Sequence, residues 1–419
     1  MGYLTRVDLR RMIAEKLGFY GTGYPTAVTS TTITDTRTAN RKREQDDYWN
    51  GGTIFIGSGT GGPSAELLTE SDLVETETNG GTVDISTVDP FDASCYKLTT
   101  TTTAGSIALA SWTVVTTPDR DVEVSFRSKG DGALCGRWAL YRLTATAADI
   151  IASEPTYITG ERWTRFVRRV TIPSGCISAA LRLYAPSKLG NTAWFDTPSV
   201  KTLGQSRYIT DWVNASSTWT TAAWSTTPAV GSTYELFYKT FSLDDYNRAI
   251  NDALRAAYPF LFEMDEDTSI TTTSATYSYD LPDSIAPNSV VKVEVEADTG
   301  SSTAPYSRLA FWSMRKQGET STLQFQHGLP TGRTVRVTFC RPLEPMLSDA
   351  DTVEERWVPY IVARARAELF GMQLGKTSRS DRTQVGENRD AFFQEAAYAL
   401  KTIAMQWPNT HIKPHLYGG

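Results

Sequence analysis

A glycine-rich stretch near the start of the chain has spacing that could serve a nucleotide site. Gly57, Gly59 and Gly62 in "GGTIFIGSGTGG" match the G-x-G-x-x-G pattern of a dinucleotide-binding loop. Such a loop needs a helix directly after its last glycine, because the pyrophosphate binds the N–H groups at that helix's N-terminus. Here Pro63, Ser64 and an acidic, Thr-rich segment follow, without βαβ alternation. The pattern therefore favours a strand and a turn over a phosphate site.

Histidine and cysteine are too few and too scattered to suggest catalysis. The three histidines are His327, His411 and His415, and the four cysteines form no C-x-x-C pair, so we expect buried thiols. His411 and His415 have the spacing of a helical metal pair, but Pro414 lies between them and no acidic partner is near. No Ser/His/Asp set, carboxylate pair or P-loop stands out. We expect no enzyme, no cofactor and no metal.

Composition restricts the class of protein further. The chain has 419 residues and a formal net charge of -6, which gives no strongly basic surface for nucleic acid. No apolar run approaches the roughly 20 residues of a membrane span. The N-terminus is charged and amphipathic where a signal peptide has an apolar core. These features favour a soluble protein that stays in the cytoplasm where it is made.

Helical periodicity occurs in four segments. Thr5 with Asp8, and Ser242 with Asp245, have the spacing of capping boxes. Pro359 fits the first position of a third helix, and Pro408 follows the last. The expected helices are 4–18, 242–258, 359–374 and 381–407.

Strand patterns fill the remaining chain. Residues 67–202 hold several short alternating segments between Gly, Pro and Asp turns, which predict a separate β-sandwich or jelly roll. The strand at "TIFI" then needs a partner elsewhere, and "RYITDW", "TWTTAAW" and "TYELFY" within 205–238 are suitable. Alternation at Val291, Val293 and Val295 predicts another strand, and "LQFQHGLPTGRTVRVTFCRP" predicts a hairpin around Gly328 to Gly332.

Joining the text on either side of 67–202 gives an order of motifs that resembles a known family. "DDYWNGGTIFIGSGTGG", "RYITD", "PAVGSTYELFY", "AINDALRAAYP" and "RTVRVTFCRPLEPMLSDADT" together resemble the neck proteins of tailed bacteriophages, the head-to-tail connectors or adaptors beneath the portal. The insertion departs from the family pattern. The resemblance covers 1–66 and about 203–419, and it implies a non-enzymatic virion protein in a twelve-subunit ring, with portal and tail proteins as partners and double-stranded DNA passing through.

The inserted segment resembles the carbohydrate-binding jelly rolls attached to glycoside hydrolases. The likeness rests on "RDVEVSFRSKG", "GERWTRFVRRVTIPSGCISAALRLYAP" and "NTAWFDTPSV". Trp112 and Trp138 are candidate glycan contacts, and Trp163 and Trp194 are considered with them. For each tryptophan, however, a place in the core is the alternative that we favour. Asp196 lies where the family has a first aspartate that could bind calcium, but Thr197 replaces the second.

The sequence therefore predicts an α+β multidomain chain. We expect a helical bundle with small antiparallel β modules, interrupted by an inserted β-sandwich of jelly-roll type. The expected parts are connector residues 1–66, the jelly roll 67–202, connector residues 203–407 and an extended tail 408–419. In the tail we expect contacts with the portal or a neighbouring ring, made by Ile412, Lys413, Pro414, His415, Leu416 and Tyr417.

The expected function is that of a structural protein at the neck of a phage virion, made in the host cytoplasm, with the jelly roll as an outward decoration. The alternative is a carbohydrate-binding accessory protein or a tail-fibre or baseplate component, in which the jelly roll is the working part. A surface glycan is a possible partner in either case, and no membrane is involved.

Overall fold

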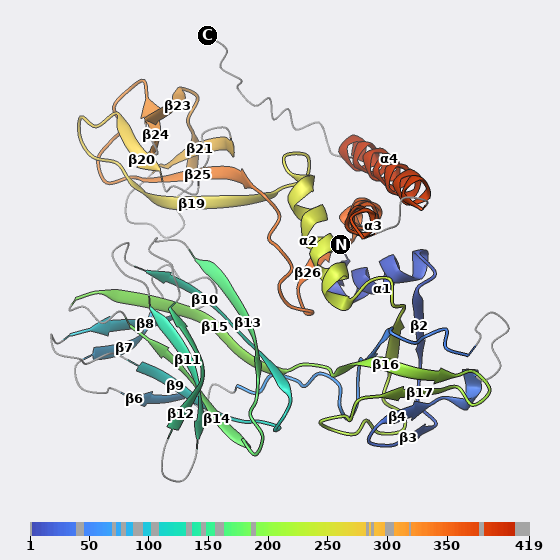
Figure 1. The fold of residues 1–419 in the computed structure, drawn as a ribbon. Coiled ribbons are helices and arrows are strands. Elements are labelled where there is room, and N and C mark those ends of the chain that lie inside the picture. Colours follow the sequence, from blue (N-terminus) through green and yellow to red (C-terminus); the bar gives the residue numbers. More distant parts are fainter. Residues whose placement is uncertain are drawn as a thin grey trace. The chain divides into compact units, whose positions relative to one another are not determined.

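The computed structural model describes most of the chain. The described residues are 2–38, 46–68, 73–76, 81–86, 95–101, 109–130, 136–143, 148–155, 163–185, 190–281, 285, 289–297, 306–317, 320–376 and 381–406. The chain divides into two compact units, which are Ala14–Asp245, and Met1–Ile13 together with Tyr246–Gly419. Figure 1 shows the helices and strands of both units.

The first unit contains a seven-stranded antiparallel sheet that is built from two distant parts of the sequence. Strand β5 forms ladders with β16 and β18, which follow it by about 150 residues or more, so the predicted partner strands are confirmed. The ring systems of Trp212 and Trp219 stack at 4.5 Å in its core. In sheet order the strands are β2 (Tyr20–Gly23), β18 (Tyr234–Phe237), β5 (Thr53–Ile56), β16 (Ser206–Val213), β17 (Thr218–Thr221), β4 (Thr32–Thr34) and β3 (Ala27–Val28). A 3-10 turn, η1, spans Thr36–Thr38. We call this sheet the split module.

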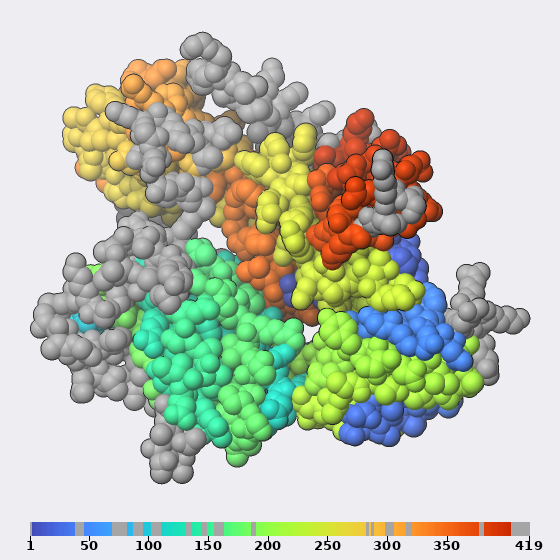
Figure 2. Space-filling model, viewed as in Figure 1, coloured from blue at the N-terminus to red at the C-terminus, as the bar shows by residue number. Residues whose placement is uncertain are grey.

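Between β5 and β16 the chain forms a sandwich of two five-stranded antiparallel sheets, so the sandwich prediction is confirmed. One hydrophobic core fills the space between the sheets. In the space-filling view the described residues of the sandwich, coloured teal and green, form a continuous surface (Figure 2). The first sheet has the order β13 (Thr164–Thr171), β10 (Asp121–Gly130), β15 (Thr192–Thr202), β8 (Cys95–Thr100) and β7 (Gly81–Ser86). The second has the order β12 (Ala148–Pro155), β11 (Arg137–Leu143), β14 (Ser178–Tyr184), β9 (Leu109–Val115) and β6 (Leu73–Thr76).

The second unit holds two further β-sheets around their own core and a short strand pair. The four-stranded sheet has the order β19 (Glu263–Thr271), β25 (Thr334–Arg341), β21 (Val290–Glu296) and β22 (Tyr306–Arg308). The three-stranded sheet has the order β20 (Ser278–Leu281), β24 (Thr320–Phe325) and β23 (Trp312–Gln317). The pair consists of β1 (Tyr3–Thr5) and β26 (Thr352–Glu354), and the 3-10 turn η4 (Glu355–Trp357) follows it. The predicted hairpin around Gly328 to Gly332 is wrong, because β24 and β25 belong to different sheets.

The four predicted helices are present. They are α1 (Arg6–Lys16), α2 (Leu243–Ala257), α3 (Val358–Leu374) and α4 (Arg382–Gln406). Both capping boxes form: the Thr5 hydroxyl accepts a hydrogen bond from the Asp8 amide, and the Ser242 hydroxyl accepts one from the Asp245 amide. A proline occupies the first turn of α3, as predicted.

The predicted fold class is nevertheless wrong. We expected a helical bundle with small β modules, whereas strands of antiparallel sheets hold 44% of the residues and helices hold 22%, in four α-helices and short turns. Helical periodicity identified the helices correctly, but it says nothing about how much of the chain packs around them. The short strands of the split module and of the second unit join into several sheets with cores of their own.

Candidate functional site

The sandwich enters and leaves the split module through neighbouring backbone segments. Glu66 and Lys201 form an antiparallel bridge, and the Ser64 amide donates to the Thr202 carbonyl at 2.9 Å. The Glu66 carboxylate accepts a hydrogen bond from the Val200 amide at 2.7 Å. Both ends of the insertion therefore lie beside each other, as expected where a domain is inserted into a turn.

The glycine motif forms that turn and no phosphate loop. Gly59 and Gly61 have φ angles of 73° and 86°, which glycine adopts at little cost. A Cβ atom on Gly59 would come within 2.6 Å of the Ser232 hydroxyl, so close packing also requires glycine there. The Gly62 amide donates to the Gly59 carbonyl, and no helix follows within the described residues 63–68. The match to the nucleotide pattern arises from turn chemistry.

Arg120 fastens the sandwich to this turn. Its side chain is 5 % exposed, and its Nη2 donates to the carbonyls of Gly61, Gly62 and Leu203 at 3.1, 2.9 and 2.6 Å. Burial lowers the pKa of this guanidinium, and the positive charge of Arg207 lowers it further. The turn and the returning strand thus share one buried donor.

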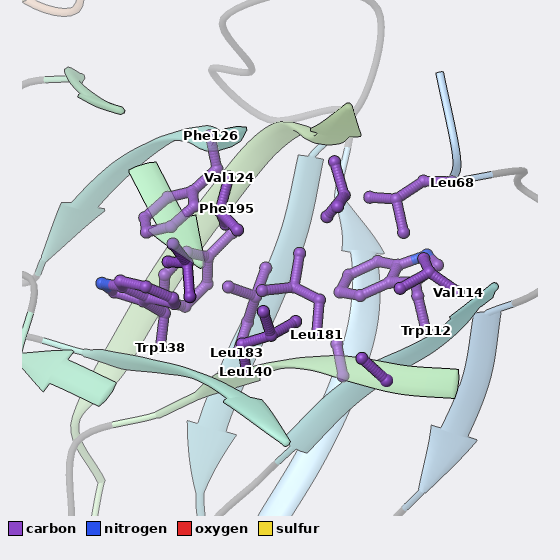
Figure 3. Packing of buried hydrophobic residues seen from close by; sticks show 14 of the residues in the cluster. Leu68, Trp112, Val114, Val124, Phe126, Trp138, Leu140, Leu181, Leu183 and Phe195 are labelled. Carbon is purple, nitrogen blue, oxygen red and sulfur yellow. The ribbon is translucent and has the colours of Figure 1, made fainter. Parts of the chain in front are cut away.

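The candidate glycan contacts Trp112 and Trp138 lie in the core instead. Each is 1 % exposed, and Figure 3 shows them among the other hydrophobic residues between the sheets. Trp112 lies two residues before Val114 on β9, and Trp138 lies two residues before Leu140 on β11, so each tryptophan points to the same side of its sheet as a core residue. Because neither ring has an accessible face, neither can stack on a sugar in this structure, and the core alternative holds for both.

Trp163 and Trp194 are outside that core. Both are half-buried, and the Lys129 ammonium lies 4.9 Å from the Trp163 ring centroid and 5.4 Å from that of Trp194. Lys129 is itself 6 % exposed, so the two rings enclose a cation on the outer side of the first sheet. Asp196 is buried on neighbouring β15, opposite Arg127 in the ladder register. Within the described residues, no cluster of three or more His, Cys, Asp or Glu side chains is arranged to hold a metal.

The outer side of the second sheet carries a compact group of polar and aromatic side chains. Leu140 on β11 and Leu181 on β14 point into the core, and the residues that alternate with such positions point outward. The outward residues are Arg137, Ala139 and Tyr141 on β11, and Ala180, Arg182 and Tyr184 on β14. We call these six residues the tyrosine–arginine face. Small alanines lie opposite Tyr141 and Arg182 in the register, which leaves room above the sheet for the long side chains.

Four contacts order this face. The Tyr184 hydroxyl donates to the Tyr141 hydroxyl at 3.0 Å, and the Arg182 guanidinium carbon lies 4.4 Å from the Tyr141 ring centroid. The Arg137 guanidinium carbon lies 5.5 Å from the Tyr184 ring centroid, and its Nε donates to the Ser153 hydroxyl at 3.0 Å. These cation–π and hydrogen-bond contacts hold four long side chains in defined positions before any ligand arrives.

The electrostatics keep the Tyr184 phenol neutral. Burial raises the pKa of Tyr184 to about 12, and the hydrogen bond with Tyr141 contributes to the increase. Tyr184 therefore remains a hydrogen-bond donor at neutral pH. With two phenol hydroxyls and two guanidinium groups, the tyrosine–arginine face offers several donors and acceptors on a preformed surface, and the neighbouring Ser153 hydroxyl adds another.

The sequence contained a signal for this face that was missed. In "GRWALYRL" and "SAALRLYA", strict alternation places Trp138, Leu140, Leu181 and Leu183 on one side. The residues in between form the other side of the sheet, and in both segments they include an arginine and a tyrosine. The candidate glycan contacts were chosen because tryptophan is the largest aromatic residue, and the two tryptophans that were chosen lie in the core.

Other predicted residues have separate outcomes. Cys95 and Cys176 are buried, in agreement with the expected buried thiols, Cys340 is half-buried, and Cys135 lies outside the described residues. The predicted partner contacts Ile412, Lys413, Pro414, His415, Leu416 and Tyr417 also lie outside the described residues. Among the helices that the structure describes, none is long and apolar enough to cross a membrane.

Comparisons with known proteins give similarities to part of the chain. No protein-family model and no curated protein matches the sequence. An enzymatically active domain of tailspike protein 4 from bacteriophage CBA120 is 19% identical, with a TM-score of 0.26; the match covers 31% of this chain and 19% of that chain. A CBM22-1 xylan-binding domain from Paenibacillus barcinonensis is 14% identical over 39% of this chain and 98% of that chain, with a TM-score of 0.25.

A third similar structure is a family 11 carbohydrate-binding module from Clostridium thermocellum in complex with a mixed-linked tetrasaccharide. It is 10% identical over 36% of this chain and 96% of that chain, with a TM-score of 0.26. The two carbohydrate-binding modules are thus covered almost completely, whereas this chain spans about a fifth of the tailspike domain. These structures give no support to the neck-protein resemblance.

Proposed function

We propose that this chain is a non-enzymatic binding protein whose inserted sandwich holds a glycan on the tyrosine–arginine face. The observation that carries the proposal is the ordered group of Tyr141, Arg182 and Tyr184 on the outer side of a sheet, away from the core. Sugars are recognised through hydroxyl groups, which pair well with fixed phenol and guanidinium donors. In this proposal the split module and the second unit have a structural role, and the sandwich is the binding domain.

Preorganisation favours this face over the tryptophan pair on the first sheet. Lys129 lies between Trp163 and Trp194 and is almost fully buried, so it stabilises the rings from within the protein. On the tyrosine–arginine face, Arg137 is exposed and the other long side chains are half-buried. The side chains of the tyrosine–arginine face are therefore both ordered and accessible to a ligand.

Glycan-array binding of the full chain tests the proposal. We expect binding to a defined set of oligosaccharides by the wild type, and loss of most of the signal when Tyr141 and Tyr184 are both replaced by Ala. The matched control is Tyr208→Ala, because Tyr208 is an exposed tyrosine on β16 of the split module. An array on which the wild type and the double variant give the same signal would reject this face as the binding site.

A connector role at the phage neck is the second candidate. The observation that favours it is the pairing of β5 with β16 and β18, because the neck-protein resemblance requires these segments to form one module across the insertion. In this proposal the chain is a virion component that assembles with portal or tail proteins. Native mass spectrometry tests it: a ring near twelve subunits supports the role, and a persistent monomer that ignores a portal protein rejects it.

A further inference from the structure

The tyrosine–arginine face is positively charged, although the protein as a whole is acidic. The chain has a net charge of -6, yet the charged residues of this face are Arg137 and Arg182. The described acidic residues of adjacent strand β12 do not join them. Glu154 lies opposite the core residue Trp138 and pairs with Arg168 at 2.7 Å, and Asp149 lies opposite Arg142 at the far end of the ladder.

Arg137 and Arg182 differ from other surface arginines of the sandwich in their partners. Arg168 and Arg169 each form an ion pair, with Glu154 and Asp121 respectively. Within the described part of the chain, neither Arg137 nor Arg182 has a carboxylate within ion-pair distance, and Arg182 Nε has no hydrogen-bond partner. Their positions are fixed by neutral groups instead, namely the two phenols and the Ser153 hydroxyl.

A guanidinium that is held in place without an acidic partner can bind the negative group of a ligand without first breaking an ion pair. Its planar N–H groups fit a carboxylate or sulfate with two parallel hydrogen bonds, which are about twice as strong as those between neutral groups. Resting on the proposed glycan-binding function, we infer that the ligand is an anionic polysaccharide, whose acidic groups are bound by Arg182 and Arg137 while Tyr141 and Tyr184 contact its hydroxyls. The shared chemistry of the ligand is a negative group on a sugar.

Binding of defined polymers to the full chain tests this inference. The probes are polygalacturonate, its fully methyl-esterified form, dextran sulfate and a neutral mixed-linked glucan, measured by affinity electrophoresis and titration calorimetry. We expect a charged polymer to bind at least about tenfold more tightly than the neutral ones, because each charge-assisted pair changes affinity by about that factor. The arms with polygalacturonate and dextran sulfate distinguish a carboxylate from a sulfate.

Variants locate the effect. Arg182→Met and Arg137→Gln should each weaken binding of the charged polymer about tenfold, and Arg168→Gln, which changes an ion-paired arginine of the same sandwich, should leave it unchanged. Circular dichroism and Tm of each variant confirm that the sandwich is folded. Equal binding of neutral and charged polymers overturns the anionic specificity but leaves the glycan-binding function intact. Binding of no polymer or array glycan overturns both.

Discussion

The Arg120 side chain offers the sharpest prediction about how the inserted sandwich is held. Arg120→Ala removes a donor that serves the carbonyls of Gly61, Gly62 and Leu203. One Nη2 carries two hydrogens for these three carbonyls, so we count the set as equivalent to two full hydrogen bonds. At about 1.5 kcal/mol for each full bond from a charged group, the lower end of the usual range, the loss is about 3 kcal/mol.

Local hydrogen exchange measures this loss where it occurs. The Gln205 amide donates to the Gly61 carbonyl at 3.1 Å and reports on opening of the turn. A loss of about 3 kcal/mol corresponds to roughly a hundredfold faster exchange of this amide, provided that it exchanges through local opening. Arg120→Lys keeps the charge on a side chain that is one bond shorter, so its ammonium reaches the three carbonyls less well and should give an intermediate rate.

The control is Arg169→Ala in the same sheet. Arg169 pairs with Asp121 at the surface, with a side chain that is 57% exposed, so its loss should cost less than about 1 kcal/mol. If Arg120→Ala and Arg169→Ala change the exchange of Gln205 equally little, the reasoning about a buried shared donor is refuted.

Three further predictions concern stability and titration. Replacing residues 67–202 by a short Gly-Ser linker should leave a cooperatively unfolding split module, because Glu66 and Lys201 already form a bridge; a non-cooperative product in circular dichroism would contradict this. Burial alone would raise the pKa of Asp349, but Arg10 and Arg6 hold it at about 2. Asp349→Asn should therefore cost about 2 kcal/mol at pH 7, and urea titrations should show this difference shrinking as the pH falls from 4 towards 2; a constant difference would contradict the ion-pair account. Tyr184, with its pKa raised to about 12, contributes stability below pH 10 that is lost as the pH rises through 12. Tyr184→Phe should therefore remove the part of the absorbance change at 295 nm that titrates near pH 12. Loss of a component that titrates near pH 10 instead would contradict the assignment.

Local signals predicted the elements that depend on local chemistry. The capping residues Thr5 and Ser242 fixed two helix starts, because a cap bonds within its own turn. The partner of the "TIFI" strand was also predicted correctly. The sequence after the glycine turn has no helix pattern, which excluded a phosphate loop and left a strand that needs a partner elsewhere. These predictions required only neighbouring residues and the order of motifs.

Sheet assembly was harder to predict because it depends on distant contacts. The turn between β24 and β25 has hairpin chemistry at Gly332, but the two strands pair with β20 and β19 respectively. Trp112 and Trp138 were chosen by residue type, whereas their place in the alternation put them in the core. The tyrosine–arginine face contains no tryptophan, so a choice by that residue type could not predict it. Its residues Tyr141, Arg182 and Tyr184 come together only when β11 pairs with β14.

The position of a bound oligosaccharide tests the central claim most directly. A crystal structure of the full chain with the best oligosaccharide from the array should show the sugar on the tyrosine–arginine face, with polar contacts to Arg182 and to at least one of the hydroxyls of Tyr141 and Tyr184. A sugar bound instead beside Lys129, Trp163 and Trp194, or on the split module, would contradict the account.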